Sequence, residues 1–307
     1  VEALQQLGIE ISYEENEGFP PIKIKGKKIS KNKITLKANV SSQYISALLL
    51  IAPKLENGLE LTLEGEITSI PYIKMTLALL NDLGIETSFE NNKIIVYHTE
   101  FVQETQLTIE SDWSSASYFY SIIALSETGT QITLSSYKQN SLQGDSALVT
   151  IFKDFGVETT FNDNNSITLS KKNDLKFEIL NFELNNCPDI AQTIAVACFG
   201  LGIGCNLTGL HTLKIKETDR LEALKTELTK LGASISVTND SLILEKSNQI
   251  KENISIATYQ DHRMAMAFAP LALKVSITIN EAEVVSKSFP TFWNDLKAIG
   301  FEIEEIK

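Results

Sequence analysis

Residues 216–234 read Lys-Glu-Thr-Asp-Arg-Leu-Glu-Ala-Leu-Lys-Thr-Glu-Leu-Thr-Lys-Leu-Gly-Ala-Ser, and this stretch sets the pattern of the whole chain. Leucines recur in it at helical spacing, at Leu221, Leu224, Leu228 and Leu231. The spacing predicts an amphipathic helix with one buried face. Gly232 follows the last leucine, and glycine often ends a helix because it adopts the left-handed backbone conformation without strain.

The first five residues of the stretch, 216–220, carry four charges and a hydroxyl. Helical spacing predicts that they form a first turn, with Lys216 and Arg220 on one face. Cations at a helix N-terminus cost stability unless an anion is bound there, and the free backbone N–H groups also favour an anion. The other interpretation is a solvent-exposed, salt-bridged helix start that binds no anion. Features elsewhere in the chain are needed to distinguish the two.

The transition from helix through glycine to strand recurs along the chain, with glycines 68 to 76 residues apart. The copies are Leu7-Gly8-Ile9-Glu10, Leu83-Gly84-Ile85-Glu86, Phe155-Gly156-Val157-Glu158, Leu231-Gly232-Ala233-Ser234 and Ile299-Gly300-Phe301-Glu302. Alternating hydrophobicity and Asn-rich turns follow each glycine, as expected for strand pairs. A fixed period of this length predicts stacked or ring-arranged copies of one structural unit.

A second pattern lies half a period earlier, where a polar turn opens a helix rich in small apolar residues. Residues 190–199 and 264–273 are apolar nearly all round, which predicts buried helices. Each unit is therefore expected to be α/β, with the order strand, buried helix, strand, surface helix, strand, strand. The copy around Gly8 has lost its first half, and the four later copies are expected to be whole.

Grouping the copies in threes predicts two domains, 1–108 and 109–307, with the crossing in the polar stretch 98–112. The second domain would hold three copies and the first an incomplete set. The chain opens in the middle of a helical pattern, so we expect a sequence cut inside a structural unit, with one whole unit missing before Val1.

The composition limits the class of protein. A net charge of −12 makes nucleic acid and anionic membranes poor partners, and no apolar run is long enough to span a bilayer. The three cysteines have no metal-site spacing and suit a reducing compartment. We expect a soluble cytoplasmic monomer without a metal or cofactor. An anionic small substrate remains possible where cations cluster locally.

The polar and charged residues that stand out lie at helix starts: Ser41, Ser42, Gln43, Ser69, Tyr72, Asp189, Lys216, Glu217, Arg220, Arg263 and Lys287. In parallel repeats these starts can face one way, so serine hydroxyls, backbone N–H groups and four cations would suit phosphate and carboxylate groups. The carboxylates of Asp189 and Glu217 would lie among the cations and could perform acid–base chemistry.

Each of these residues also has a purely structural interpretation. Serine and aspartate commonly cap helices, and Tyr72 could fasten its helix to the core. His262 is more often a packing or hydrogen-bonding residue than a catalyst. Cys187 has no neighbour that would activate it, so we expect an inert thiol. The recurrence of polar groups once per half-repeat is what the structural interpretation explains poorly.

Five motifs resemble the 5-enolpyruvylshikimate-3-phosphate synthase family. They are Ser41-Ser42-Gln43, Ser111-Asp112-Trp113-Ser114-Ser115-Ala116-Ser117-Tyr118-Phe119, Lys216-Glu217-Thr218-Asp219-Arg220, Tyr259-Gln260-Asp261-His262-Arg263-Met264-Ala265-Met266 and Lys287-Ser288-Phe289-Pro290. The resemblance runs from Val1 to about Ala298. It implies a two-lobed, inside-out α/β barrel-like fold of βαβαββ units, with the site between the lobes.

The resemblance also implies the reaction: transfer of the enolpyruvyl group of phosphoenolpyruvate to the 5-hydroxyl of shikimate 3-phosphate, in the shikimate pathway to aromatic amino acids. It assigns shikimate 3-phosphate to Ser41, Ser42, Gln43, Ser69, Tyr72, Asp189 and Lys216. It assigns phosphoenolpyruvate to Gln43, Arg220, Arg263 and Lys287. Asp189 is implied as the proton acceptor and Glu217 as the second acid–base group, without any metal.

Some features of the family pattern do not match. The family's N-terminal lysine-serine-arginine motif, its glycine-rich loop and a following arginine would precede Val1, so we expect this chain to lack part of the site and to be inactive or nearly so. Thr212 stands where some members have asparagine. Two alternatives remain: the related UDP-N-acetylglucosamine enolpyruvyl transferase, and a non-catalytic repeat scaffold.

Overall fold

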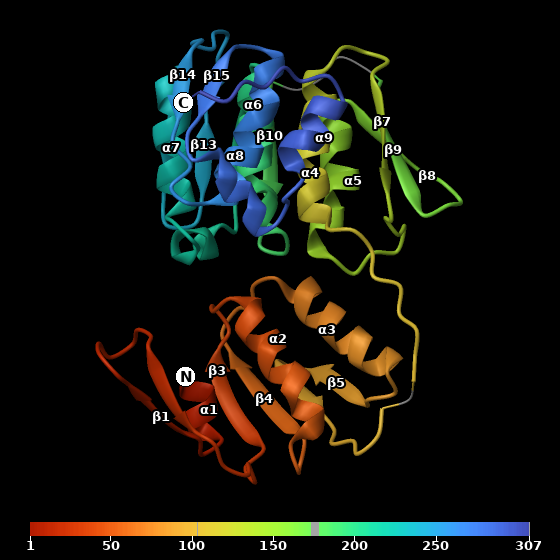
Figure 1. Cartoon of the computed structure of the whole chain (residues 1–307), viewed down its shortest axis with the longest axis vertical. Coiled ribbons are helices and arrows are strands. Elements are labelled where there is room, and N and C mark those ends of the chain that lie inside the picture. Colours follow the sequence, from red (N-terminus) through yellow and green to blue (C-terminus); the bar gives the residue numbers. More distant parts are fainter. Residues whose placement is uncertain (103, 173–177, 307) are drawn as a thin grey trace. The chain divides into compact units, whose positions relative to one another are not determined.

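The computed structural model describes residues 1–102, 104–172 and 178–306, and the chain divides into two compact units, Val1–Thr108 and Ile109–Lys307 (Figure 1). Each unit has a hydrophobic core of its own. Within the described ranges, no helix combines the length and the hydropathy that crossing a bilayer requires.

The first unit contains one complete copy of the repeat and part of another. Its elements are α1 (Glu2–Gln6), β1 (Glu10–Tyr13), β2 (Ile22–Lys25), β3 (Lys33–Lys37), α2 (Ser42–Ile51), β4 (Leu59–Glu64), α3 (Ile70–Asp82), β5 (Thr87–Glu90) and β6 (Lys93–Val96). Strands β1 and β2 form an antiparallel pair. The other strands form a sheet in the order β3-β4-β6-β5, in which only β3 and β4 are parallel.

The second unit contains three further copies. The first has α4 (Trp113–Leu125), β7 (Gln131–Ser135), α5 (Leu148–Ile151), β8 (Val157–Phe161) and β9 (Ser166–Lys171). The second has β10 (Ile179–Glu183), α6 (Ala191–Gly200), β11 (Gly204–Thr208), α7 (Arg220–Leu231), β12 (Ile235–Val237) and β13 (Leu242–Leu244). The third has β14 (Ile254–Ile256), α8 (His262–Phe268), β15 (Ile277–Ile279) and α9 (Phe292–Ala298).

The repeat order predicted from the sequence is confirmed, but not every copy is whole. The sheet β10-β11-β13-β12 repeats the order of β3-β4-β6-β5, with the same parallel first pair. Among the described residues 104–112, no strand precedes α4, although the Ser111 amide donates one backbone bond, to Ser136. In the last copy, the described residues 301–306 form no strand after α9. The expectation of four whole copies was therefore wrong for two of them.

The buried helices lie at the centre of the second unit. Helices α4, α6 and α8, one from each copy, contact one another, and every residue of α6 is buried. Alanines on α6 allow this close approach on all sides. The prediction was confirmed for residues 190–199. It was wrong at the end of 264–273, because α8 ends at Phe268 and Leu273 is exposed.

Helix α7 behaves as its sequence predicts. Its leucines at 221, 224, 228 and 231 are all fully buried, and Gly232 ends the helix with a φ of 105°. The amphipathic face therefore fastens the start of α7, which begins at Arg220, to the core of the second unit.

Replacing Leu224 by alanine should lower the free energy of unfolding of the second unit by about 2–5 kcal/mol, because it leaves a cavity under α7. The exposed Ile243→Ala on β13 is the control and should cost far less. Urea denaturation followed by circular dichroism measures both. Equal losses for the two variants would contradict the placement of the core.

Candidate functional site

The charged stretch 216–220 does not form the helical turn that its spacing predicts. Lys216 has an extended backbone conformation, and Asp219 is the N-cap of α7, its side chain accepting a bond from the amide of Glu222 at 3.2 Å. Aspartate is a strong N-cap, so the helix begins at Arg220, directly after Asp219, and not at Lys216. Lys216 and Arg220 therefore share no helical face. They meet instead at a third residue, Asp189.

Arg220 is the centre of the cluster. Its side chain is only 2% exposed, and its guanidinium donates to three carboxylates. Nε donates to Asp261 at 2.7 Å, Nη1 to Asp189 at 3.0 Å, and Nη2 to Glu217 at 2.7 Å. A buried guanidinium is stable only when its charge is compensated in this way. Three of its five N–H donors are used in these bonds.

Asp189 lies in a short 3₁₀ turn, Pro188–Ile190, that leads into α6. Three cations surround its carboxylate: Arg220 at 3.0 Å, Arg263 at 3.3 Å and Lys216 at 3.4 Å. Burial alone would raise the pKa of Asp189, but Arg263, Lys216 and Arg220 together hold it well below its usual value. The carboxylate is therefore ionised, and it is the point at which the cations converge.

Arg263, on the first turn of α8, links Asp189 to the first copy of the unit. Its Nη2 atom lies 3.3 Å from the Asp189 carboxylate and 3.4 Å from the hydroxyl of Ser114 on α4. Ser114 in turn donates to the buried carboxylate of Asp145. Burial would lower the pKa of Arg263, yet Asp189 raises it above the usual arginine value.

Glu217 and His262 lie at the edge of the cluster. Burial would raise the pKa of Glu217, but a hydrogen bond from its own backbone and the charge of Arg220 lower it. Burial and the neighbouring Arg263 lower the pKa of His262. Among the described residues, the His262 Nδ1 atom has no hydrogen-bond partner. Glu217 is thus an ionised carboxylate next to a histidine that favours the neutral form.

Lys287 lies beside this cluster and forms no ion pair with it. It ends the 3₁₀ helix Ala282–Lys287, and its Nζ donates to the backbone carbonyl of Gln260 at 2.8 Å. Gln260 directly precedes Asp261, so Lys287 is held at the same helix start as Arg263. The structure thus brings together Asp189, Lys216, Glu217, Arg220 and Arg263. Lys287 is linked to this cluster through the backbone carbonyl of Gln260.

The candidate residues of the first unit occupy two neighbouring helix starts. Ser41 is the N-cap of α2 and accepts a bond from the amide of Gln43 at 3.4 Å, and Ser42 is the first residue of that helix. Ser69 precedes α3 in a left-handed conformation, with a φ of 58°. The amide of Tyr72 donates to the carbonyl of Ser69.

Helices α2 and α3 pack against each other close to these starts (Figure 1). The hydroxyls of Ser46 and Thr76, each within the first two turns, lie 2.8 Å apart. The five predicted residues of this unit therefore gather on one side of it, with the Gln43 side chain exposed.

Some residues of the cluster were missed in the sequence. Asp261 is fully buried and pairs with Arg220, and Asp145 is fully buried against Ser114. The position of Asp261 as a cap before an apolar helix was a usable signal. Asp145 gave none, because its partner lies 31 residues earlier. Cys187 is buried, which raises the pKa of its thiol to about 12, as expected for an unreactive thiol.

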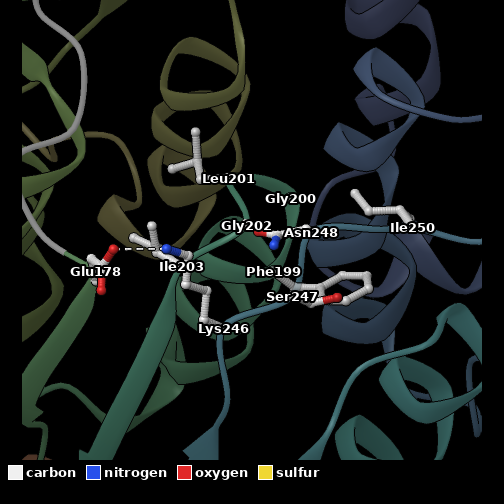
Figure 2. Close-up of a pocket in the computed structure, with 10 residues that line it drawn as sticks. All are labelled: Glu178, Phe199, Gly200, Leu201, Gly202, Ile203, Lys246, Ser247, Asn248 and Ile250. Carbon is white, nitrogen blue, oxygen red and sulfur yellow. Dashed lines mark hydrogen bonds and ion pairs between the residues drawn. The ribbon is translucent and has the colours of Figure 1, made fainter.

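An open hollow of 470 Å³ lies elsewhere in the second unit, lined by Phe199–Ile203, Lys246–Asn248, Glu178 and Ile250 (Figure 2). It lies at the C-terminal end of α6, whereas Asp189 precedes the N-terminal end. Lys246 and Glu178 neutralise each other across it at 2.8 Å. None of the candidate site residues lines this hollow, so it is not the candidate site.

Comparison with known proteins identifies relatives along nearly the whole chain. The family model described as EPSP synthase (3-phosphoshikimate 1-carboxyvinyltransferase) matches residues 1–296. A 3-phosphoshikimate 1-carboxyvinyltransferase of Bacteroides fragilis strain YCH46 is 47% identical over 307 residues, which is 99% of this chain and 74% of the relative. One from Sulfurovum sp. strain NBC37-1 is 35% identical and is covered to 69% of its length.

Solved structures resemble the chain in the same way. A 2.37 Å structure of EPSP synthase from Acinetobacter baumannii has a TM-score of 0.76 and 25% identity, and covers 99% of this chain. The enolpyruvyl transferase NikO from Streptomyces tendae has a TM-score of 0.73 at 12% identity, which shows a shared fold. These alignments extend across 97–99% of this chain and 69–74% of the relatives, and they do not show that this chain lacks part of the site.

The cations around Asp189 should make stability depend on pH in a defined direction. Because the folded state lowers the pKa of Asp189, the carboxylate stabilises the fold above its unfolded pKa of about 3.9, and this contribution is lost as the pH falls below that value. Between about pH 5 and pH 2, the free energy of unfolding should fall less steeply for Asp189→Asn than for the wild type. Denaturant titrations at each pH measure this slope.

The exposed Asp163→Asn is the matched control for this change and should follow the wild-type slope. Parallel curves for Asp189→Asn and the wild type would contradict the convergence of the three cations on Asp189.

Proposed function

Because the chain belongs to the EPSP synthase family, we propose that it transfers the enolpyruvyl group of phosphoenolpyruvate to the 5-hydroxyl of shikimate 3-phosphate, releasing phosphate. This places it in the shikimate pathway to aromatic amino acids. The observation that carries the proposal is the cluster of Lys216, Arg220 and Arg263 around Asp189, with Glu217 paired to Arg220. It offers both the cations and the carboxylates that this reaction needs.

Phosphoenolpyruvate binds to Arg220, Arg263, Lys287 and Gln43 in this proposal. Its phosphate and carboxylate groups suit guanidinium forks, which donate two parallel hydrogen bonds to a planar or tetrahedral anion. Arg220 and Arg263 are rigidly held by the carboxylates around them, so little side-chain entropy is lost when an anion binds.

Shikimate 3-phosphate binds to Ser41, Ser42, Gln43, Ser69 and Tyr72 of the first unit and to Asp189 and Lys216 of the second. Hydroxyls and backbone amides at the starts of α2 and α3 suit its phosphate, as at other helix N-termini. The Asp189 carboxylate accepts hydrogen bonds from the ring hydroxyls, and Lys216 contributes a further positive charge.

Asp189 accepts the proton of the attacking hydroxyl, and Glu217 exchanges a proton at the methylene carbon. Without substrate, three cations lower the pKa of Asp189, which makes it a weak base. Once the anionic groups of phosphoenolpyruvate accept bonds from the remaining donors of Arg220 and Arg263, their negative charge offsets the positive charge around Asp189, and the pKa of Asp189 rises. Binding of phosphoenolpyruvate thus makes Asp189 a stronger base toward the hydroxyl of shikimate 3-phosphate.

The alternatives are weaker. The related UDP-N-acetylglucosamine transferase is disfavoured because the family model and the curated relatives carry the EPSP synthase name. A non-catalytic scaffold has no need to bury Arg220 among three carboxylates. We further propose that the protein acts as a monomer.

A coupled assay for phosphate release on the 307-residue chain tests the proposal, together with the thermal shift that shikimate 3-phosphate produces. We expect turnover that requires both substrates. Asp189→Asn should lower kcat by about 10²- to 10⁴-fold, since it removes the base. Arg263→Lys should raise the KM for phosphoenolpyruvate about tenfold or more, because a charge-assisted bond is lost.

The exposed Asp163→Asn is the control and should leave both constants unchanged. The proposal would be overturned if the chain showed no turnover and shikimate 3-phosphate produced no thermal shift. A thermal shift with a UDP-sugar would then favour the related transferase, and no shift with either ligand would favour the non-catalytic scaffold.

A further inference from the structure

The turn that carries Asp261 and Arg263 has an unusual backbone. Tyr259 and Gln260 both have positive φ values, 54° and 57°, and the amide of Asp261 closes the turn onto the carbonyl of Thr258 at 2.9 Å. Two consecutive left-handed residues are normally Asn or Gly, because a larger side chain is strained there. Such a conformation persists only where the surrounding structure holds it.

A buried glutamate on α7 holds this turn. The Glu227 side chain is fully buried, and its carboxylate accepts the Tyr259 hydroxyl at 2.6 Å and the Ala257 amide at 3.2 Å. Lys230 compensates the negative charge at 2.7 Å. Burial and the bond to Glu227 raise the pKa of Tyr259 to about 12, so the hydroxyl stays protonated and remains a donor.

The same turn determines where the cations of the site lie. It ends in Asp261, which receives the bond from Arg220, and it runs directly into Arg263 on α8. The carbonyl of Gln260, within the turn, receives Lys287. Helix α7 therefore contacts the turn 258–261 at two points: Arg220, at the start of the helix, pairs with Asp261, and Glu227, two helical turns later, accepts the Tyr259 hydroxyl.

We propose that Glu227 and Tyr259 are positioning residues for phosphoenolpyruvate binding: their hydrogen bond keeps the turn 258–261 in its strained conformation and so places Arg263 and Lys287. This inference rests on the proposed function. Neither residue belongs to the cluster around Asp189, and each acts through the backbone that it holds. Without the bond the turn relaxes, and the two cations lose their alignment with the bound anion.

Steady-state kinetics of Tyr259→Phe and Glu227→Ala test the proposal. Tyr259→Phe removes one hydroxyl and keeps the ring. We expect both variants to raise the KM for phosphoenolpyruvate about tenfold or more, because small misplacements of binding groups are costly, and to leave the KM for shikimate 3-phosphate within about twofold. A purely structural role would lower the melting temperature without this split between substrates.

Glu222→Ala, an exposed glutamate of the same helix paired with Lys225, is the matched control and should behave as the wild type. Hydrogen exchange gives a second measurement that needs no turnover: the amides of 257–263 should exchange faster in Tyr259→Phe. If the wild type shows neither turnover nor a thermal shift with shikimate 3-phosphate, the proposed function fails while the exchange data still test the turn. Wild-type KM values in Tyr259→Phe, or unchanged exchange, would overturn the inference.

Discussion

The buried guanidinium of Arg220 constrains the arrangement of the second unit. Removing that charge from water is tolerable only because Asp189, Glu217 and Asp261 all accept hydrogen bonds from it. These carboxylates come from two successive copies of the repeat, so the copies must pack with their buried-helix starts together. Arg263 extends the network to the first copy through Ser114. The site is therefore a consequence of how three repeats assemble.

Each copy in the second unit contributes an aspartate at the start of its buried helix: Asp112, Asp189 and Asp261. Asp112 and Asp261 cap their helices, and Asp261 also pairs with Arg220. Asp189 makes no cap bond with its side chain and instead collects three cations. One repeated structural position has thus acquired different tasks. A chain with a net charge of −12 can hold Lys216, Arg220 and Arg263 close together in this way, because Asp189, Glu217 and Asp261 compensate their charges.

The sequence predicted the repeat, its element order and most residues of the cluster, since helical spacing, glycine ends and polar helix starts are local signals. It failed where a contact between distant segments decides the outcome. The stretch 216–220 was expected to be helical, but Asp219 caps the helix and the preceding residues turn toward Asp189. Spacing also did not reveal that the described residues just before α4 and after α9 form no strand. Asp145 was missed for the same reason, whereas Asp261 could have been found from its capping position.

The central claim is that the cations held around Asp189 form the binding place of an anionic substrate. A crystal structure of the chain with phosphoenolpyruvate and shikimate 3-phosphate tests it most directly. The account predicts an anionic group of phosphoenolpyruvate within hydrogen-bonding distance of the guanidinium groups of both Arg220 and Arg263, with a hydroxyl of the second ligand on the Asp189 carboxylate. A ligand bound elsewhere, without contact to the guanidinium group of Arg220 or Arg263, would contradict it.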